Sequence, residues 1–140
     1  METPIMYPKV KDPTMVGEYP AFANSGAGYV WDEVLEYRVW FHEDDGDDYY
    51  YAFEDAETAL ECSREEATAK APHALILQKE YISESEEGQY IHMKEERITE
   101  WPIEFLSRPR RTERTIPDFM SPDAPENKLD IIRGLVNKNA

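Results

Sequence analysis

The segment at residues 34–42, which reads VLEYRVWFH, constrains the fold of this chain more than any other part of its sequence. Its apolar residues recur with a period of two, which is typical of a β-strand with one buried face. The pattern places Leu35, Tyr37, Val39 and Phe41 on the buried face and Arg38, Trp40 and His42 on the other. A strand of this kind needs a sheet and a second layer that covers it.

An aromatic segment at residues 49–53, which reads YYYAF, follows this strand after an acidic stretch around Gly46. The two segments are predicted to pair as a β-hairpin. A two-residue turn at Asp45 and Gly46 would place like charges directly opposite each other, which is unfavourable. We therefore predict a longer loop, over about residues 43–48.

The stretch after the hairpin has the periodicity of an amphipathic helix. Asp55 is suited to cap its start, and Pro72 is expected to end it. The inward face of this helix is predicted to contain Ala56, Ala59, Leu60, Ser63 and Ala67.

Two more strands are expected at residues 73–82 and 89–101, joined by the turn SESEEG, and residues 101–106 are a possible fifth strand. The resulting order is strand, strand, helix, strand, strand (ββαββ). Because the connections between paired strands are short, the sheet is predicted to be antiparallel. The sequence therefore predicts an α+β fold with four to five strands and one core helix.

The rest of the chain divides by composition. Residues 1–28 contain four prolines and no regular periodicity, so they are predicted to form an extended arm before a core domain at residues 29–107. Residues 108–122 are rich in arginine and proline and are expected to be a linker.

Residues 123–140 are predicted to form a C-terminal amphipathic helix. Asp123 and Glu126 have the spacing of a capping box, and Pro125 suits a first helical turn. The apolar face of this helix would contain Leu129 and Ile132 together with Leu135 or Val136. That face has two possible docking sites, the same chain or another chain, and the sequence leaves the choice open.

The charge of the chain limits its partners. Its 30 acidic and 15 basic residues give a net charge of −15, which makes direct binding to nucleic acid unexpected. Such a charge attracts basic proteins and is able to imitate a nucleic-acid backbone. A single cysteine, Cys62, excludes an internal disulfide bond. No apolar run approaches the ~20 residues of a membrane span and no signal peptide is recognised, so a cytoplasmic location without membrane insertion is expected.

No pattern of catalytic or metal-binding residues emerges. The acidic stretch around Gly46 does not fit a calcium-binding EF-hand loop, because ligand positions 1 and 12 would be Phe41 and Ala52. The glutamates near Cys62 are expected to raise the pKa of its thiol, which is the wrong direction for a nucleophile. The spacing of the three histidines indicates no cluster. We therefore predict no catalytic residue, no metal site and no cofactor.

Three segments, YVWDEVLEYRVW, YYYAFEDAETAL and EFLSRPRR, resemble those of short bacterial proteins that are often labelled GCN5-type N-acetyltransferases. The resemblance covers about residues 29–114. It implies coenzyme A binding through a Gln/Arg-x-x-Gly-x-Gly/Ala turn before a helix, where backbone N–H groups point at the phosphates. The corresponding spacing here is Ala23-x-x-Gly26-x-Gly28, and Ala23 stands in the Gln/Arg position.

The aromatic residues of the predicted hairpin outnumber those that one helix is able to cover, because a strand directs alternate side chains to both faces. The other face is expected to meet the chain's own arm or C-terminal helix, or a partner. The arginines after the core are expected to pair with acids in cis or across a dimer. The candidate partner-binding residues are Trp40, Tyr49, Tyr51, Phe53, Arg108, Arg110, Arg111, Leu129 and Ile132.

These observations favour a protein-binding accessory or regulatory subunit whose partner is another protein or a second copy of itself. One alternative is an acetyltransferase of the family that the chain resembles. A further alternative is an acidic nucleic-acid mimic that inhibits a DNA-binding protein.

Overall fold

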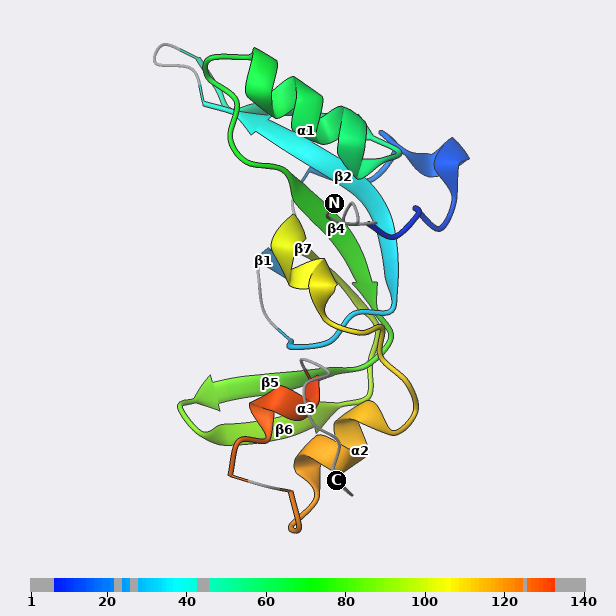
Figure 1. Cartoon of the computed structure of the whole chain (residues 1–140), viewed down its shortest axis with the longest axis vertical. Helices are drawn as coiled ribbons and strands as arrows, with labels where there is room; N and C mark the ends of the chain where they lie inside the picture. Colours follow the sequence, from blue (N-terminus) through cyan, green and yellow to red (C-terminus); the bar gives the residue numbers. More distant parts are fainter. Residues whose placement is uncertain (1–6, 22–23, 26–27, 43–45, 125, 133–140) are drawn as a thin grey trace, which may run out of the picture.

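Figure 1 shows the computed structural model of the chain, which is elongated. The structure describes residues 7–21, 24–25, 28–42, 46–124 and 126–132. Its strands are β1 (Asn24–Ser25), β2 (Glu33–Phe41), β3 (Tyr49–Phe53), β4 (His73–Gln78), β5 (Tyr81–Glu86), β6 (Gln89–Met93) and β7 (Arg97–Pro102). Its helices are η1 (Pro13–Met15), α1 (Ala56–Glu65), η2 (Ile103–Ser107), α2 (Thr115–Met120) and α3 (Leu129–Ile132).

The fold is α+β, as predicted, with an antiparallel sheet that carries α1 on one face. The larger sheet has the order β1-β7-β4-β2-β3, in which β1 is a short parallel addition to β7 and the other four strands are antiparallel. A separate two-stranded sheet consists of β5 and β6. At the opposite end of the molecule from α1, this small sheet lies beside α2 and α3 (Figure 1).

The two long strands predicted at residues 73–82 and 89–101 are each divided in the structure. β4 pairs with β7, and this ladder ends at Gln78 opposite Arg97, so β5 and β6 continue outside the larger sheet. Beside this end of β4, the backbone N–H of Lys79 donates to the Asp32 carboxylate at 2.7 Å. This N–H is on the side of β4 that faces β2, where the backbone N–H of Asp32 donates to the Leu77 carbonyl at 2.9 Å. The Asp32 side chain thus takes the donor that would otherwise extend the pairing of β4 with β2.

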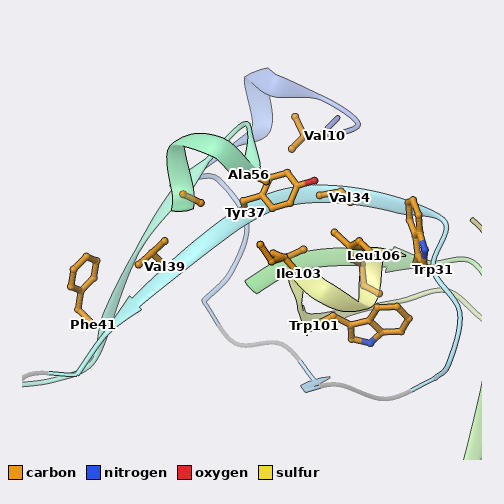
Figure 2. Packing of buried hydrophobic residues seen from close by; sticks show 13 residues of the cluster. Val10, Trp31, Val34, Tyr37, Val39, Phe41, Ala56, Trp101, Ile103 and Leu106 are labelled. Atoms are coloured by element: carbon orange, nitrogen blue, oxygen red, sulfur yellow. The ribbon is translucent and has the colours of Figure 1, made fainter. Parts of the chain in front are cut away.

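The main core lies between α1, η2 and one face of β2, β4 and β7 (Figure 2). Tyr37, Val39 and Phe41 of β2 are buried there, as the alternation predicted, and Val34 is buried there as well. The assignment of Leu35 to this face was wrong, because a register shift between Val34 and Glu36 adds a residue to β2. Leu35 packs on the opposite face, in a cluster with Leu75 and Leu77.

Helix α1 begins as predicted. The Asp55 carboxylate accepts a hydrogen bond of 2.7 Å from the backbone N–H of Thr58. Ala56 and Ala59 of the helix are buried, as predicted. The helix ends at Glu65, earlier than Pro72, because Glu66 has extended backbone angles. Ala67 is exposed in a turn, so its assignment to the inward face was wrong.

The C-terminal third contains more structure than predicted. The expected linker includes α2, whose Pro117 occupies the first helical turn, where no hydrogen bond is lost. Ile116 and Phe119 of α2 are buried. The described part of the predicted C-terminal helix is only α3, which starts at Leu129 rather than after Asp123. Residues 133–140, and with them Leu135 and Val136, lie outside the described residues.

A second hydrophobic cluster holds this third of the chain against β5. It consists of Val30, Tyr81, Ile82, Ile116, Phe119 and Ile132. Its members come from the loop before β2, from β5 and from both short helices. None of the helices in the described residues is long and apolar enough to cross a membrane.

Candidate functional site

The face of β2 that carries Arg38 is covered by the N-terminal arm of the same chain. Arg38 is fully buried, and its Nη1 and Nη2 donate to the backbone carbonyls of Ala21 at 3.1 Å and Pro20 at 2.7 Å. Glu36, also fully buried, accepts a hydrogen bond of 2.9 Å from the backbone N–H of Gly17. The arm is therefore part of the domain that it covers.

Trp40 belongs to the same covered region and is half-buried. Its Nε1 donates to Glu100 at 2.7 Å, and its ring centroid lies 4.8 Å from that of Tyr50. Glu100 also contacts His73 Nδ1 at 2.9 Å and Arg38 Nη1 at 3.1 Å. Burial acts to raise the pKa of Glu100, but these hydrogen bonds and the charge of Arg38 outweigh it and lower that pKa.

The three predicted arginines bind their own chain. Arg111 forms a paired contact with Asp32, in which Nε and Nη2 each lie 2.9 Å from Oδ1, and its Nη1 lies 3.1 Å from Glu80. Arg110 pairs with Glu33 at 3.0 Å. The Nη1 of Arg108 donates to the backbone carbonyl of Tyr29 at 3.3 Å. The segment after η2 is thus attached in cis to the residues around the start of β2.

The apolar residues of α3 also pack in cis. Ile132 is buried in the second hydrophobic cluster, and Leu129 is partly buried against it. Phe53, at the end of β3, is half-buried against the main core beside α1. These three residues are therefore turned toward the protein's own interior.

Two of the predicted aromatic residues remain on the surface. Tyr49 and Tyr51 of β3 are exposed, and their rings pack on Phe41 at centroid distances of 4.9 and 5.1 Å. Asp47 and Asp48 precede them and are exposed as well. We call Tyr49, Tyr51, Asp47 and Asp48 the aromatic edge. The preceding loop residues 43–45 lie outside the described residues.

β3 is also an edge strand. Within the described part of the chain β2 is the one strand that pairs with it. The opposite edge of the sheet is β1, which has two residues. β3, which carries Tyr49 and Tyr51 of the aromatic edge, is therefore the longer of the two edge strands of the larger sheet.

A pocket of about 370 Å³ lies where the two sheets meet. It is lined by Gly28, Tyr29, Ile82, Ser83, Glu84, Arg97 and Arg108. Of these, the sequence had indicated only Arg108 as a site residue. The rest were missed because they come from three separate places in the chain, and the one local signal was the glycine-rich segment that ends at Gly28.

Two ionisable groups of this pocket are hydrogen-bonded to each other. The Tyr29 hydroxyl donates to the Glu84 carboxylate, which also accepts the backbone N–H of Gly88 at 2.8 Å. Burial, together with this hydrogen bond, raises the pKa of Tyr29 to about 12. The bonds from Tyr29 and Gly88 lower the pKa of Glu84, so Glu84 is charged and Tyr29 neutral at pH 7.

The described residues contain no group of three or more His, Cys, Asp or Glu side chains arranged to hold a metal ion. Gly28, the last residue of the glycine motif, is followed by β2 and not by a helix. No family model matches the chain, and no curated protein or solved structure shows significant similarity to it.

Proposed function

We propose that the protein is a binding subunit that takes up an extended, basic segment of a partner protein along β3. The observation that carries this proposal is the aromatic edge: an edge strand with Tyr49 and Tyr51 exposed beside two aspartates. An extended peptide can add to such an edge through main-chain hydrogen bonds, while side chains of the strand give specificity.

The character of this edge supports a binding role. Proteins commonly protect an edge strand with lysine, proline or a bulge, because an open edge promotes association. β3 contains none of these, and Tyr51 is 54% exposed. Tyrosine is enriched in binding interfaces because it combines a large apolar area with a polar group.

Charge supports a basic partner over a second copy of the same chain. The chain has a net charge of −15, and Asp47 and Asp48 lie directly before the strand. Two copies paired through β3 would bring two strongly acidic chains together, which is unfavourable. A segment rich in lysine or arginine would instead be attracted during association.

The experiment begins with capture of the partner on the tagged protein and continues with both proteins purified. The Tyr51→Ser variant is compared with Ile91→Ser, because Ile91 on β6 is exposed to a similar extent, 51%. We expect Tyr51→Ser to weaken binding by about tenfold or more, as for a central interface residue. Ile91→Ser is expected to bind like the unchanged protein.

The same measurement separates this proposal from a nucleic-acid mimic. A mimic depends on its charge, so its binding would fall steeply with salt and would be indifferent to Tyr51→Ser. Equal affinities of the unchanged protein and Tyr51→Ser would therefore overturn the proposal. Deletion of the arm is unsuitable as a test, because Pro20 and Ala21 bind the buried Arg38.

A further inference from the structure

The pocket between the two sheets carries charges of both signs, and it is separate from the aromatic edge. Arg97 begins β7, Arg108 follows η2, and Glu84 belongs to β5. Its volume of about 370 Å³ is near the lower end of the range for small-molecule sites.

Arg97 is held in position by neighbouring side chains. Its Nε donates to Gln78 Oε1 at 2.7 Å, and its guanidinium lies 3.8 Å from the centroid of the Tyr81 ring. Gln78 is fully buried and is itself oriented by a hydrogen bond of 2.8 Å from Nε2 to the Val30 carbonyl. No ion pair joins Arg97 to a carboxylate among the described residues.

Arg108 is oriented in a similar way. Its Nη1 donates to the backbone carbonyl of Tyr29 at 3.3 Å. Its guanidinium lies 4.8 Å from the ring centroid of Phe105 and 5.4 Å from that of Trp101. Two guanidinium groups are therefore placed at one pocket before any ligand arrives, which lowers the entropic cost of binding.

Gly28 brings the loop before β2 into this pocket. Its φ of +101° is rarely adopted by other residues, and an added Cβ would lie 2.9 Å from Arg97 Nη2 and 2.3 Å from Gln78 Nε2. Its carbonyl accepts hydrogen bonds from the backbone N–H groups of Val30 at 2.9 Å and Ile82 at 3.0 Å. The loop wall is thus fixed to β5, against Arg97.

We propose that this pocket binds a small zwitterion, an amino acid or a short peptide, with its carboxylate at Arg97 and Arg108 and its ammonium group at Glu84. The planar guanidinium matches a carboxylate in a two-point hydrogen bond. A ligand with negative charge alone would be repelled by Glu84, and one with positive charge alone by the arginines. A zwitterion satisfies both.

The test uses the full chain and measures its melting temperature and ligand affinity by calorimetry. The probes are each proteinogenic amino acid and simple dipeptides, with their N-acetyl and amide derivatives, inorganic phosphate and acetyl-CoA. We expect at least one free zwitterion to raise the melting temperature, because a ligand that binds only the folded state stabilises it. Its N-acetyl and amide derivatives are expected to bind at least about tenfold more weakly.

Three variants assign the contacts. Arg97→Gln is expected to weaken binding of the zwitterion by about tenfold or more. Glu84→Gln should weaken binding of the free zwitterion but leave the affinity for its N-acetyl derivative unchanged. Arg64→Gln is the matched control, since it removes one positive charge from α1, at the far end of the molecule from β5 (Figure 1).

Circular dichroism of each variant without ligand shows whether it is folded. If Arg97→Gln fails this check, it is replaced by the conservative Arg97→Lys. The proposal is overturned if no amino acid or dipeptide stabilises the protein. It is also overturned if phosphate or acetyl-CoA alone does so, or if a folded Arg97 variant binds the zwitterion as tightly as the unchanged protein. The acetyl-CoA result would favour acyl transfer instead.

Discussion

Glu36 and Arg38 lie two residues apart on β2 and form an ion pair of 2.7 Å in which neither side chain is exposed to solvent. Two neighbouring charges are rarely buried together, because each loses its hydration. Here the loss is offset by further partners: Arg38 also binds Glu100 and two backbone carbonyls of the arm, and Glu36 binds Gly17. The pair therefore joins the sheet to the arm.

Removal of one member of this pair should destabilise the protein strongly. We expect Arg38→Met to lower the free energy of unfolding by about 3–5 kcal/mol, because it leaves Glu36 buried without its partner. Arg114→Met is the matched control: Arg114 pairs with Asp118 at 3.8 Å but is 72% exposed, so its loss should cost less than about 1 kcal/mol. Urea denaturation measures the free energy of unfolding of both variants. Equal losses would contradict the conclusion that the buried pair of Glu36 and Arg38 stabilises the fold.

Acid should weaken the protein partly through Glu100. Its pKa in the folded state is lower than its ordinary value of 4.5, so its ionised form stabilises the fold above that pH. This contribution is lost as the pH falls below 4.5 and through the folded-state pKa. We expect the urea midpoint of Glu100→Gln to depend less on pH than that of the unchanged protein across this acidic range. Parallel profiles would show that Glu100 does not contribute.

Cys62 should react slowly with alkylating reagents. Burial and the charges of Glu66 and Glu65 raise the pKa of its thiol, so less thiolate is present at pH 8. We expect the double variant Glu65→Gln, Glu66→Gln to react with iodoacetamide faster, by less than about tenfold because these carboxylates are exposed and screened. Mass spectrometry follows the rate. Glu57→Gln, in the first turn of α1, is the control, and a similar acceleration there would reject the local explanation.

Gly28 and Gly88 should respond differently to alanine. Both have positive φ, +101° and +79°, so either substitution strains the backbone by about 1–2 kcal/mol. At Gly88 the new Cβ would meet open space, whereas at Gly28 it would lie 2.3 Å from buried Gln78. We expect Gly28→Ala to be clearly the more destabilising in a thermal melt. Similar melting temperatures would mean that the loop before β2 is able to move away from Arg97.

Local patterns in the sequence predicted the elements that depend on neighbouring residues. The period of two over Tyr37, Val39 and Phe41 of β2 and the Asp55 cap of α1 are both present, because each is decided within a few residues of the chain. Features that depend on one distant group were missed. The pairing of β4 with β2 ends where the Asp32 carboxylate accepts the N–H of Lys79, 47 residues away.

The residues of the candidate site divide in the same way, into those that a local pattern predicted and those that depend on distant parts of the chain. Tyr49 and Tyr51 were predicted from the excess of aromatic residues, and both are exposed. Trp40 belonged to the same prediction, but it is half-buried, because its ring packs on Tyr50 and its Nε1 binds Glu100, 60 residues away. The pocket residues Glu84 and Arg97 carry no local signal, because only the junction of the two sheets brings them together.

By itself, the sequence determined the α+β class, the acidic character and the presence of more aromatic residues than one helix covers. Only the tertiary structure decided which groups cover them. Arg111 binds Asp32 across 79 residues, and the arm binds Arg38, so surfaces that looked available for partners are occupied in cis. The reason is physical: secondary structure follows from short-range hydrogen bonds and periodicity, whereas burial follows from contacts between distant segments.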